Sequence, residues 1–177
     1  MDTLNPIKLL TLIAMGAILS ACGREAPVAP EQDEAAAPET PEVEPLAEGE
    51  EGFSIEIGGD DNMRFDVTEF TVEPGQHVTI TFNNVGTMPK ASMGHNLVVL
   101  RMGVDKLEFA RDAQRHIRNE YVAPEREGDV IASTRVLGPG ESATLVFRAP
   151  EEPGDYDYVC SFPGHTEAGM VGIMTVE

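Results

Sequence analysis

The chain has 177 residues, 31 of them acidic and 12 basic, which gives a formal net charge of −19. Residues 53–177 alone hold 20 acidic and 10 basic residues. Because proteins that bind nucleic acid carry basic patches, this balance argues against a nucleic-acid partner and suits a partner of opposite charge.

Residues 1–22 are typical of a lipoprotein signal peptide. Lys8 supplies a positive charge, and an apolar run of eleven residues follows it, Leu9–Leu19. Such a run is too short to cross a bilayer as a helix and has the length of a signal-peptide core. It leads into Leu-Ser-Ala-Cys, which is similar to the lipobox where bacterial lipoproteins are cut before a cysteine that is then acylated. We therefore expect export and acylation of Cys22; an ordinary signal peptide with an incidental cysteine is the alternative.

Acyl chains on Cys22 would hold the mature protein on the periplasmic side of a bacterial membrane without spanning it. Gly23 follows the cysteine, at a position where aspartate often retains lipoproteins at the inner membrane. The absence of an aspartate at this position slightly favours the outer membrane.

Residues 23–52 are rich in alanine, proline and glutamate, with ten acidic and no basic residues between Glu25 and Glu51. A segment with so few large apolar side chains cannot form a core. Its prolines and like charges favour an extended chain, which at about 3.1 Å per residue could reach about 90 Å. We predict a disordered acidic tether between the lipid anchor and a domain. The alternative, a passive spacer, hardly differs from this prediction.

Residues 53–177 form the predicted domain, a length that suffices for one core. Alternating apolar and polar side chains indicate strands, and a change of face within 64–72 predicts a bend there. Strands are expected at 53–57, 64–72, 77–84, 95–102, 130–137, 142–150, 154–160 and 169–177. Short strands separated by Gly/Pro turns predict an all-β fold, a Greek-key sandwich or barrel.

Residues 105–121 break this pattern and predict one helix, inserted as a flap between strands. Its apolar positions recur at helical spacing: Leu107, Ala110, Ala113 or Gln114, and Ile117. The three arginines of the segment, Arg111, Arg115 and Arg118, are interpreted as a solvated face rather than a binding patch.

Cys160 is the only cysteine besides Cys22, so acylation of Cys22 leaves it as a free thiol in an exported protein. Such a thiol calls for an explanation. It opens the segment CSFPGHTEAGM, which also carries His165 and Met170. Thiolate, imidazole and thioether suit copper, and a His₂Cys set with a long axial Met is the blue-copper electron-transfer site.

Such a site needs a second histidine from elsewhere in the domain. His77 begins a strand beside the inward-facing Val78, and His116 lies among the arginines of the predicted helix. His95 remains, at the end of a loop that enters a strand, although a lone histidine in a strand is usually a core or surface residue.

At this point the domain resembles the cupredoxins, in particular the azurin and auracyanin branch of small blue copper proteins. The segments that carry the resemblance are MPKASMGHNLVVL (88–100), VIASTRVLGPGESATLVF (130–147) and CSFPGHTEAGM (160–170). The resemblance implies one copper ion, Cu⁺ or Cu²⁺, with His95, Cys160 and His165 as equatorial ligands and Met170 as the weak axial ligand.

The resemblance also implies supporting roles. The carbonyl of Gly94 would approach copper as a weak backbone contact. Asn96 would tie the two ligand loops together through the hydroxyl of Ser161. An apolar docking patch would surround His165, formed by Met88, Pro89, Met93, Pro163 and Ala168.

Two departures from azurins stand out. Four residues separate His165 from Met170 where azurins have three, which is closer to auracyanins and makes the Met170 contact the most open to question. No cysteine remains for the azurin disulfide. The lipobox and tether are similar to those of lipid-modified azurins of Gram-negative bacteria.

These observations predict a membrane-tethered one-electron carrier between periplasmic redox proteins, such as a cytochrome or respiratory complex and a terminal oxidase or reductase. A copper chaperone or storage protein is the alternative, although the eight methionines are scattered. An enzyme such as a multicopper oxidase or nitrite reductase is not expected, because no His-x-His pair occurs and Cys160 is flanked by Val159 and Ser161.

Overall fold

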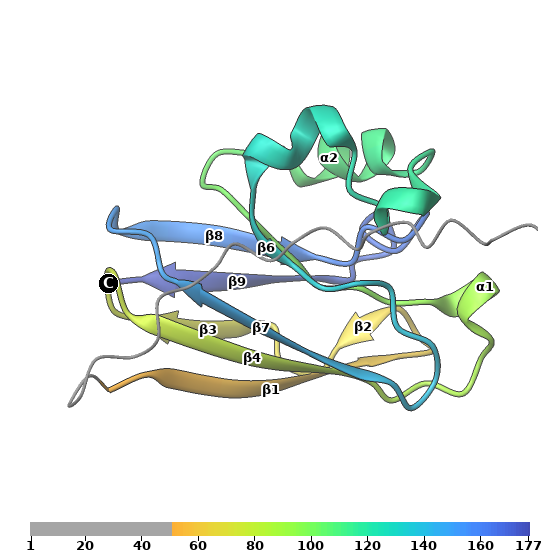
Figure 1. Ribbon diagram of the computed structural model, residues 1–177, viewed down its shortest axis with the longest axis horizontal. Coiled ribbons are helices and arrows are strands. Elements are labelled where there is room, and N and C mark those ends of the chain that lie inside the picture. Colours follow the sequence, from red (N-terminus) through yellow and green to blue (C-terminus); the bar gives the residue numbers. More distant parts are fainter. Residues whose placement is uncertain (1–50) are drawn as a thin grey trace, which may run out of the picture. The chain divides into compact units, whose positions relative to one another are not determined.

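The computed structural model describes residues 51–177 (Figure 1). The predicted signal peptide, Cys22 and the tether up to residue 50 lie outside the described residues. None of the helices within residues 51–177 is long and apolar enough to span a bilayer.

One sheet has four strands in the order β2-β1-β4-β7. Strands β1 and β4 run parallel, and the other neighbours are antiparallel. In β4 every second side chain points inward, as the alternation predicted, so that Val78, Ile80 and Phe82 are fully buried. The strands are β1 (Phe53–Asp60), β2 (Arg64–Phe65), β4 (His77–Asn84) and β7 (Ser142–Arg148).

The second sheet has five strands in the order β3-β9-β8-β5-β6. Strand β3 is parallel to β9, and the remaining pairs are antiparallel. The strands are β3 (Glu69–Val72), β9 (Val171–Val176), β8 (Gly154–Val159), β5 (Val98–Leu100) and β6 (Val130–Ser133). The expected bend within 64–72 is confirmed, because β2 and β3 lie in different sheets.

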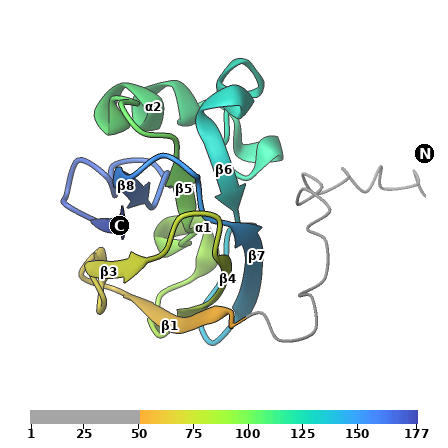
Figure 2. The same cartoon turned by 90° about the vertical axis from the view of Figure 1, so that its left-hand side faces the viewer.

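The two sheets face each other across the main core, as the end-on view in Figure 2 shows. Its buried members come from both sheets and include Ile57, Phe82, Leu145, Tyr158 and Met174. The expected all-β sandwich with a helical insert is therefore confirmed.

The insert lies outside the five-stranded sheet, where α2 (Lys106–Ala113) covers one face (Figure 2). The Asp105 carboxylate caps the helix by accepting the N–H groups of Leu107 and Glu108. Two 3₁₀ turns complete the insert, η1 (Ile117–Asn119) and η2 (Pro124–Asp129). The predicted helix over 105–121 was therefore too long.

The predicted inner face of the helix was right at Ala110 and Ala113, which are buried, and wrong at Leu107 and Ile117. Leu107 and Ile117 are 39 % and 65 % exposed, whereas Phe109 is fully buried. Phe109 packs with Leu100 and Val159 in a second, smaller core on the outer face of the five-stranded sheet. The large ring of Phe109 sets the buried face, and the helix ends before Ile117.

Three connections meet at one end of the sandwich (Figure 1). They are the loop after β8, the connection between β6 and β7, and the segment between β4 and β5, which contains α1 (Lys90–Met93). Strand β1 begins at the other end, where Phe53 pairs with Val78 near the start of β4.

Candidate metal centre

Three candidate ligands converge inside the domain. The Nδ1 atoms of His95 and His165 are 3.2 Å apart. The Cys160 sulfur lies 3.4 Å from Nδ1 of His165 and 3.9 Å from Nδ1 of His95. The exposed fractions of His95, Cys160 and His165 are 0 %, 0 % and 2 %, so all three donor atoms face one another away from solvent.

Cys160 follows directly after β8, and the loop that it opens closes on itself. The Cys160 N–H donates to the Met170 carbonyl at 3.1 Å, and the Met170 N–H donates to the His165 carbonyl at 2.9 Å. The Thr166 hydroxyl donates to the Cys160 carbonyl at 2.8 Å. Gly164, with φ +85°, takes a left-handed turn between the thiol and the imidazole, a conformation that glycine adopts without strain.

His95 follows α1 and is fixed by its backbone. Its N–H donates to the Leu137 carbonyl at 3.1 Å, and the Leu137 N–H donates back at 2.7 Å. Gly94 precedes it in a crowded position, where an added Cβ would lie 2.7 Å from the Lys90 carbonyl oxygen. This position therefore requires glycine; the weak contact of its own carbonyl with metal stays a prediction.

Met170 is fully buried at the end of the ligand loop, one residue before β9. Its terminal methyl lies against Gly59 of β1, where an added Cβ would be 2.8 Å from Met170 Cε. The longer interval between His165 and Met170 thus still places the thioether inside the core.

Burial sets the protonation of this centre. It raises the pKa of the Cys160 thiol to about 12, against backbone hydrogen bonds from Asn96 and Phe162 that favour the thiolate. Burial, with a smaller effect from His95, lowers the pKa of His165 to about 4. Burial also lowers the pKa of His95, although Asp60 and Asp61 oppose this. Both imidazoles are therefore neutral near pH 7 and free to act as ligands.

Asn96 joins the two ligand segments. Its Nδ2 donates to the Ser161 hydroxyl at 2.9 Å, and its Oδ1 accepts the Ser161 N–H at 2.9 Å. Both residues are fully buried. The expected hydrogen bond between Asn96 and the Ser161 hydroxyl is present, next to His95 on one side and Cys160 on the other.

The donor set fits copper. One buried thiol and two neutral imidazoles, with a thioether close by in the chain, are ligands that copper accepts in both oxidation states. Within residues 51–177 no other group of three histidine, cysteine or acidic side chains lies close enough to hold a metal ion. His77 and His116 are not part of the group.

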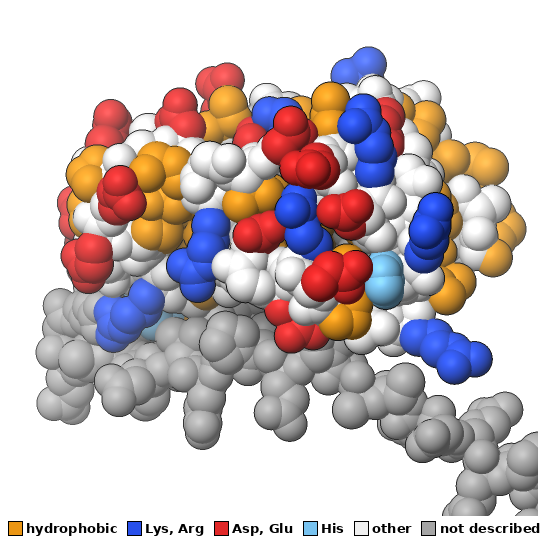
Figure 3. All heavy atoms as spheres, turned by 90° about the horizontal axis from the view of Figure 1, so that it is seen from above, with side chains coloured by type: hydrophobic (Ala, Val, Ile, Leu, Met, Phe, Trp, Pro, Cys, Tyr) orange, Lys and Arg blue, Asp and Glu red, His pale blue; other side chains and the backbone are white. Residues whose placement is uncertain are grey.

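The predicted docking patch is largely at the surface. Met88 is 41 % exposed, and Pro89, Pro163 and Ala168 are also exposed. Met93 is half-buried. Hydrophobic side chains gather at the right-hand end in Figure 3, the end at which α1 lies in Figure 1. His165, which this patch was expected to surround, is itself almost fully buried.

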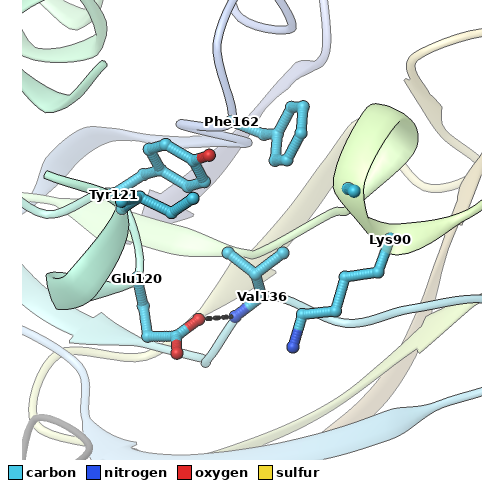
Figure 4. A pocket seen from close by; sticks show the side chains of 7 residues that line it. Lys90, Glu120, Tyr121, Val136 and Phe162 are labelled. Carbon is cyan, nitrogen blue, oxygen red and sulfur yellow. Dashed lines mark hydrogen bonds between the residues drawn. The ribbon is translucent and has the colours of Figure 1, made fainter. Parts of the chain in front are cut away.

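A pocket of about 380 Å³ adjoins this end and was not foreseen from the sequence (Figure 4). Its wall includes Phe162, whose ring centroid lies 4.7 Å from that of His165 and 5.1 Å from that of Tyr121. The residues that line it are Lys90, Ala91, Ile117, Glu120, Tyr121, Val136 and Phe162. They come from four separate segments, so no local motif could have indicated the pocket.

Known proteins share both the sequence and the fold of this domain. Azurin of Alcaligenes faecalis is 38% identical over 117 residues, which cover 63% of this chain and 88% of that protein. Outer membrane protein H.8 of Neisseria gonorrhoeae is 37% identical over 111 residues, so the match covers 62% of this chain and spans 60% of H.8.

Solved structures of auracyanins are similar in fold. Reduced auracyanin from Roseiflexus castenholzii has a TM-score of 0.64 at 37% identity, covering 71% of this chain and 98% of that one. Auracyanin A, a "blue" copper protein from Chloroflexus aurantiacus, has a TM-score of 0.64 at 29% identity, covering 72% and 100%. The model of a family described as copper-binding proteins of the plastocyanin/azurin family matches residues 53–177. The chain therefore belongs to the plastocyanin/azurin family of copper-binding proteins, as a cupredoxin of the azurin/auracyanin type with a site that fits one copper ion.

Proposed function

We propose that the protein is a type 1 copper electron carrier in which His95, Cys160, His165 and Met170 would hold the copper ion. The observation that carries this proposal is the buried convergence of one thiol and two Nδ1 atoms within 4.8 Å. Copper bound there would supply a one-electron couple between Cu⁺ and Cu²⁺.

The protein's own contribution is to hold the ligands in place. Cys160 is fixed by β8, His95 by its backbone pairing with Leu137, and His165 by a loop that closes on Met170. Copper(I) and copper(II) prefer different geometries, so a site that rearranges little would make the change of charge fast.

Electron transfer, rather than catalysis, is the function that this arrangement favours. Side chains of this chain supply all four proposed ligands, which leaves substrate no coordination position. Residues 51–177 contain one group of side chains that could bind a metal ion, whereas multicopper enzymes need further copper centres.

Buried ligands also weigh against a copper chaperone or storage role, because such proteins release metal readily. Slow copper loss to a mild chelator together with a reversible redox couple is the expected result for a carrier. Rapid copper loss without such a couple would favour the chaperone.

We further propose that partners dock at the patch around Met88, Pro89, Met93, Pro163 and Ala168. Its exposed apolar side chains support this proposal, and transient redox complexes need only small interfaces. The partners would be periplasmic redox proteins, such as a cytochrome or respiratory complex as donor and a terminal oxidase or reductase as acceptor.

The proposed location is the periplasmic side of a bacterial membrane, with the protein anchored through an acylated Cys22. The lipobox-like sequence supports the anchor. The match to a protein named outer membrane protein H.8 supports the outer membrane.

A reciprocal pair of variants tests both proposals. Cys160→Ser is expected to stay in the membrane fraction and to lose the intense thiolate-to-copper absorption. Cys22→Ser is expected to become soluble and to stay blue. A blue Cys160→Ser protein would refute the copper assignment, and a membrane-bound Cys22→Ser protein would refute the lipid anchor.

A further inference from the structure

Two consecutive residues at the end of the η1 turn have a left-handed backbone. Glu120 has φ 53° and Tyr121 has φ 59°. This conformation is unfavourable for residues other than glycine or asparagine, and it persists only where the surrounding structure holds it. The contacts that hold this pair lead to the segments that carry the candidate copper ligands.

The two backbone carbonyls of the pair each bind one ligand segment. Glu120 O accepts a hydrogen bond from Asn96 Nδ2 at 2.8 Å, and Tyr121 O accepts one from the Ser161 hydroxyl at 2.6 Å. Asn96 follows His95 in the chain, and Ser161 follows Cys160. The Asn96–Ser161 pair is therefore not isolated, because the insert holds it from a third side.

The Glu120 carboxylate binds a further segment. Its Oε2 accepts the Val136 N–H at 2.6 Å, as Figure 4 shows. Val136 precedes Leu137, whose backbone pairs with that of His95 in both directions. Glu120 thus reaches His95 by two routes, through Asn96 and through Val136.

The Tyr121 side chain is linked to the remaining histidine, His165, through the ring of Phe162. Its ring meets the Phe162 ring edge-on with centroids 5.1 Å apart, and the Phe162 ring lies 4.7 Å from the His165 ring. Together the two residues touch neighbours of all three converging ligands.

We propose that Glu120 and Tyr121 form a latch that makes the helical insert part of the copper site, with Glu120 as a positioning residue. This proposal rests on the copper function proposed above. The latch fixes the distance between the His95 and Cys160 segments, so that the ligand set keeps one shape when the metal changes its oxidation state. Three hydrogen bonds and one ring contact hold the strained backbone of the two residues in place.

Four variants of the full chain separate the hydrogen bond from the backbone strain. Glu120→Ala removes the carboxylate and keeps the strained position, whereas Glu120→Gly removes the carboxylate and relieves the strain. Glu120→Gln keeps an oxygen acceptor at the same reach. Glu127→Ala removes an exposed glutamate from the same insert and serves as the matched control.

The first measurement uses metal-free protein and follows hydrogen exchange of two amides by NMR. Val136 N–H bonds to Glu120 itself, whereas Ser161 N–H bonds to Asn96. In Glu120→Ala and Glu120→Gly both amides are expected to exchange about tenfold faster or more. Glu120→Gln and Glu127→Ala are expected to stay near the native rates. Faster exchange at Val136 alone would overturn the latch.

The second measurement uses copper(II)-loaded protein and records the absorption and electron paramagnetic resonance spectra. Glu120→Ala and Glu120→Gly are expected to change the copper hyperfine splitting, and Glu120→Gln to restore it. A native spectrum in Glu120→Ala overturns the proposal. Should Glu120→Ala fail to fold, the unstrained Glu120→Gly decides. Should the native chain give no blue centre, the proposed function fails, while Ser161 exchange in metal-free protein still decides the latch.

Discussion

Gly59 is a single residue whose missing side chain makes room for a proposed ligand. It is buried in β1, and a Cβ built there would lie 2.8 Å from Met170 Cε and 3.1 Å from the Phe82 ring. The end of a methionine side chain is flexible, so the thioether would yield before the backbone does. The position of this proposed ligand thus depends on a strand that contributes no proposed ligand itself.

We therefore predict that Gly59→Ala displaces the Met170 thioether and alters the copper centre. Overpacking of this kind destabilises a core by about 1–3 kcal/mol, and we expect the lower end because Met170 can move. The reduction potential and the copper(II) resonance spectrum are the measurements, with urea unfolding for stability.

Gly128→Ala is the matched control, because no atom lies within 4 Å of a Cβ built there. An unchanged potential and spectrum in Gly59→Ala would contradict this prediction.

Among the elements, α2 depends on one capping side chain. The N–H groups of Glu108 and Leu107 hydrogen-bond to the Asp105 carboxylate and lower its pKa below the ordinary value of 3.8. A carboxylate with a lowered folded-state pKa stabilises the protein above its unfolded-state pKa, and that stabilisation is lost as pH falls through the folded-state value.

Asp105→Ala is accordingly predicted to lower the thermal midpoint at pH 7 by about 2–5 °C. Asp105→Asn keeps an oxygen acceptor and is expected to lose less. Calorimetry of metal-free protein is the measurement, at pH 7 and in acid well below pH 3.8, where Asp105 is protonated in the folded state as well. The advantage of aspartate over asparagine should vanish there. Equal midpoints for native and Asp105→Ala protein would contradict the capping role.

The elements also show what could be predicted from the sequence. The bounds of β4 were predicted correctly because only one of its faces is packed in the main core, which leaves a clear alternation. Strand β5 was predicted too long, since the insert covers its outer face and all three residues are buried. Helix α1 gave no signal, because none of its four residues is buried.

The same limit applies to the candidate site. Cys160, His165 and Met170 could be proposed as ligands from their spacing in one loop, and His95 from the resemblance of its flanking sequence to that of azurins. Glu120 could not, because its role arises from a left-handed backbone that distant segments hold in place. Nor could the contact of the Phe162 ring with His165, which depends on the folded turn.

At the scale of the whole molecule, the proposed ligands are part of a core that extends well beyond them. Cys160 and Met170 belong to the same buried cluster as Ile57, Phe82 and Tyr158, which fill the space between the sheets. Most of the apolar burial therefore does not require a metal ion.

We predict that chelating the copper leaves the domain folded but less stable. A ligand that binds only the folded state adds about 2.7 kcal/mol at one hundred times its dissociation constant. Circular dichroism should show the same strand signal with and without copper, and the thermal midpoint should rise on copper addition. Cys160→Ser should remove that rise. Loss of the strand signal on chelation would contradict the prediction.

The place where β1 begins has a consequence for how an anchored protein would face its surroundings. Eight residues of β1 extend about 26 Å at roughly 3.3 Å per residue, and they separate Phe53 from the end that holds the ligand loops (Figure 1). A membrane attachment through the preceding residues would therefore join the domain at the end opposite the ligand loops. Soluble carriers, or complexes in a facing membrane, could dock at the end that carries the ligand loops without any reorientation of the domain. A partner in the same membrane could dock there only after the domain had turned over relative to its attachment.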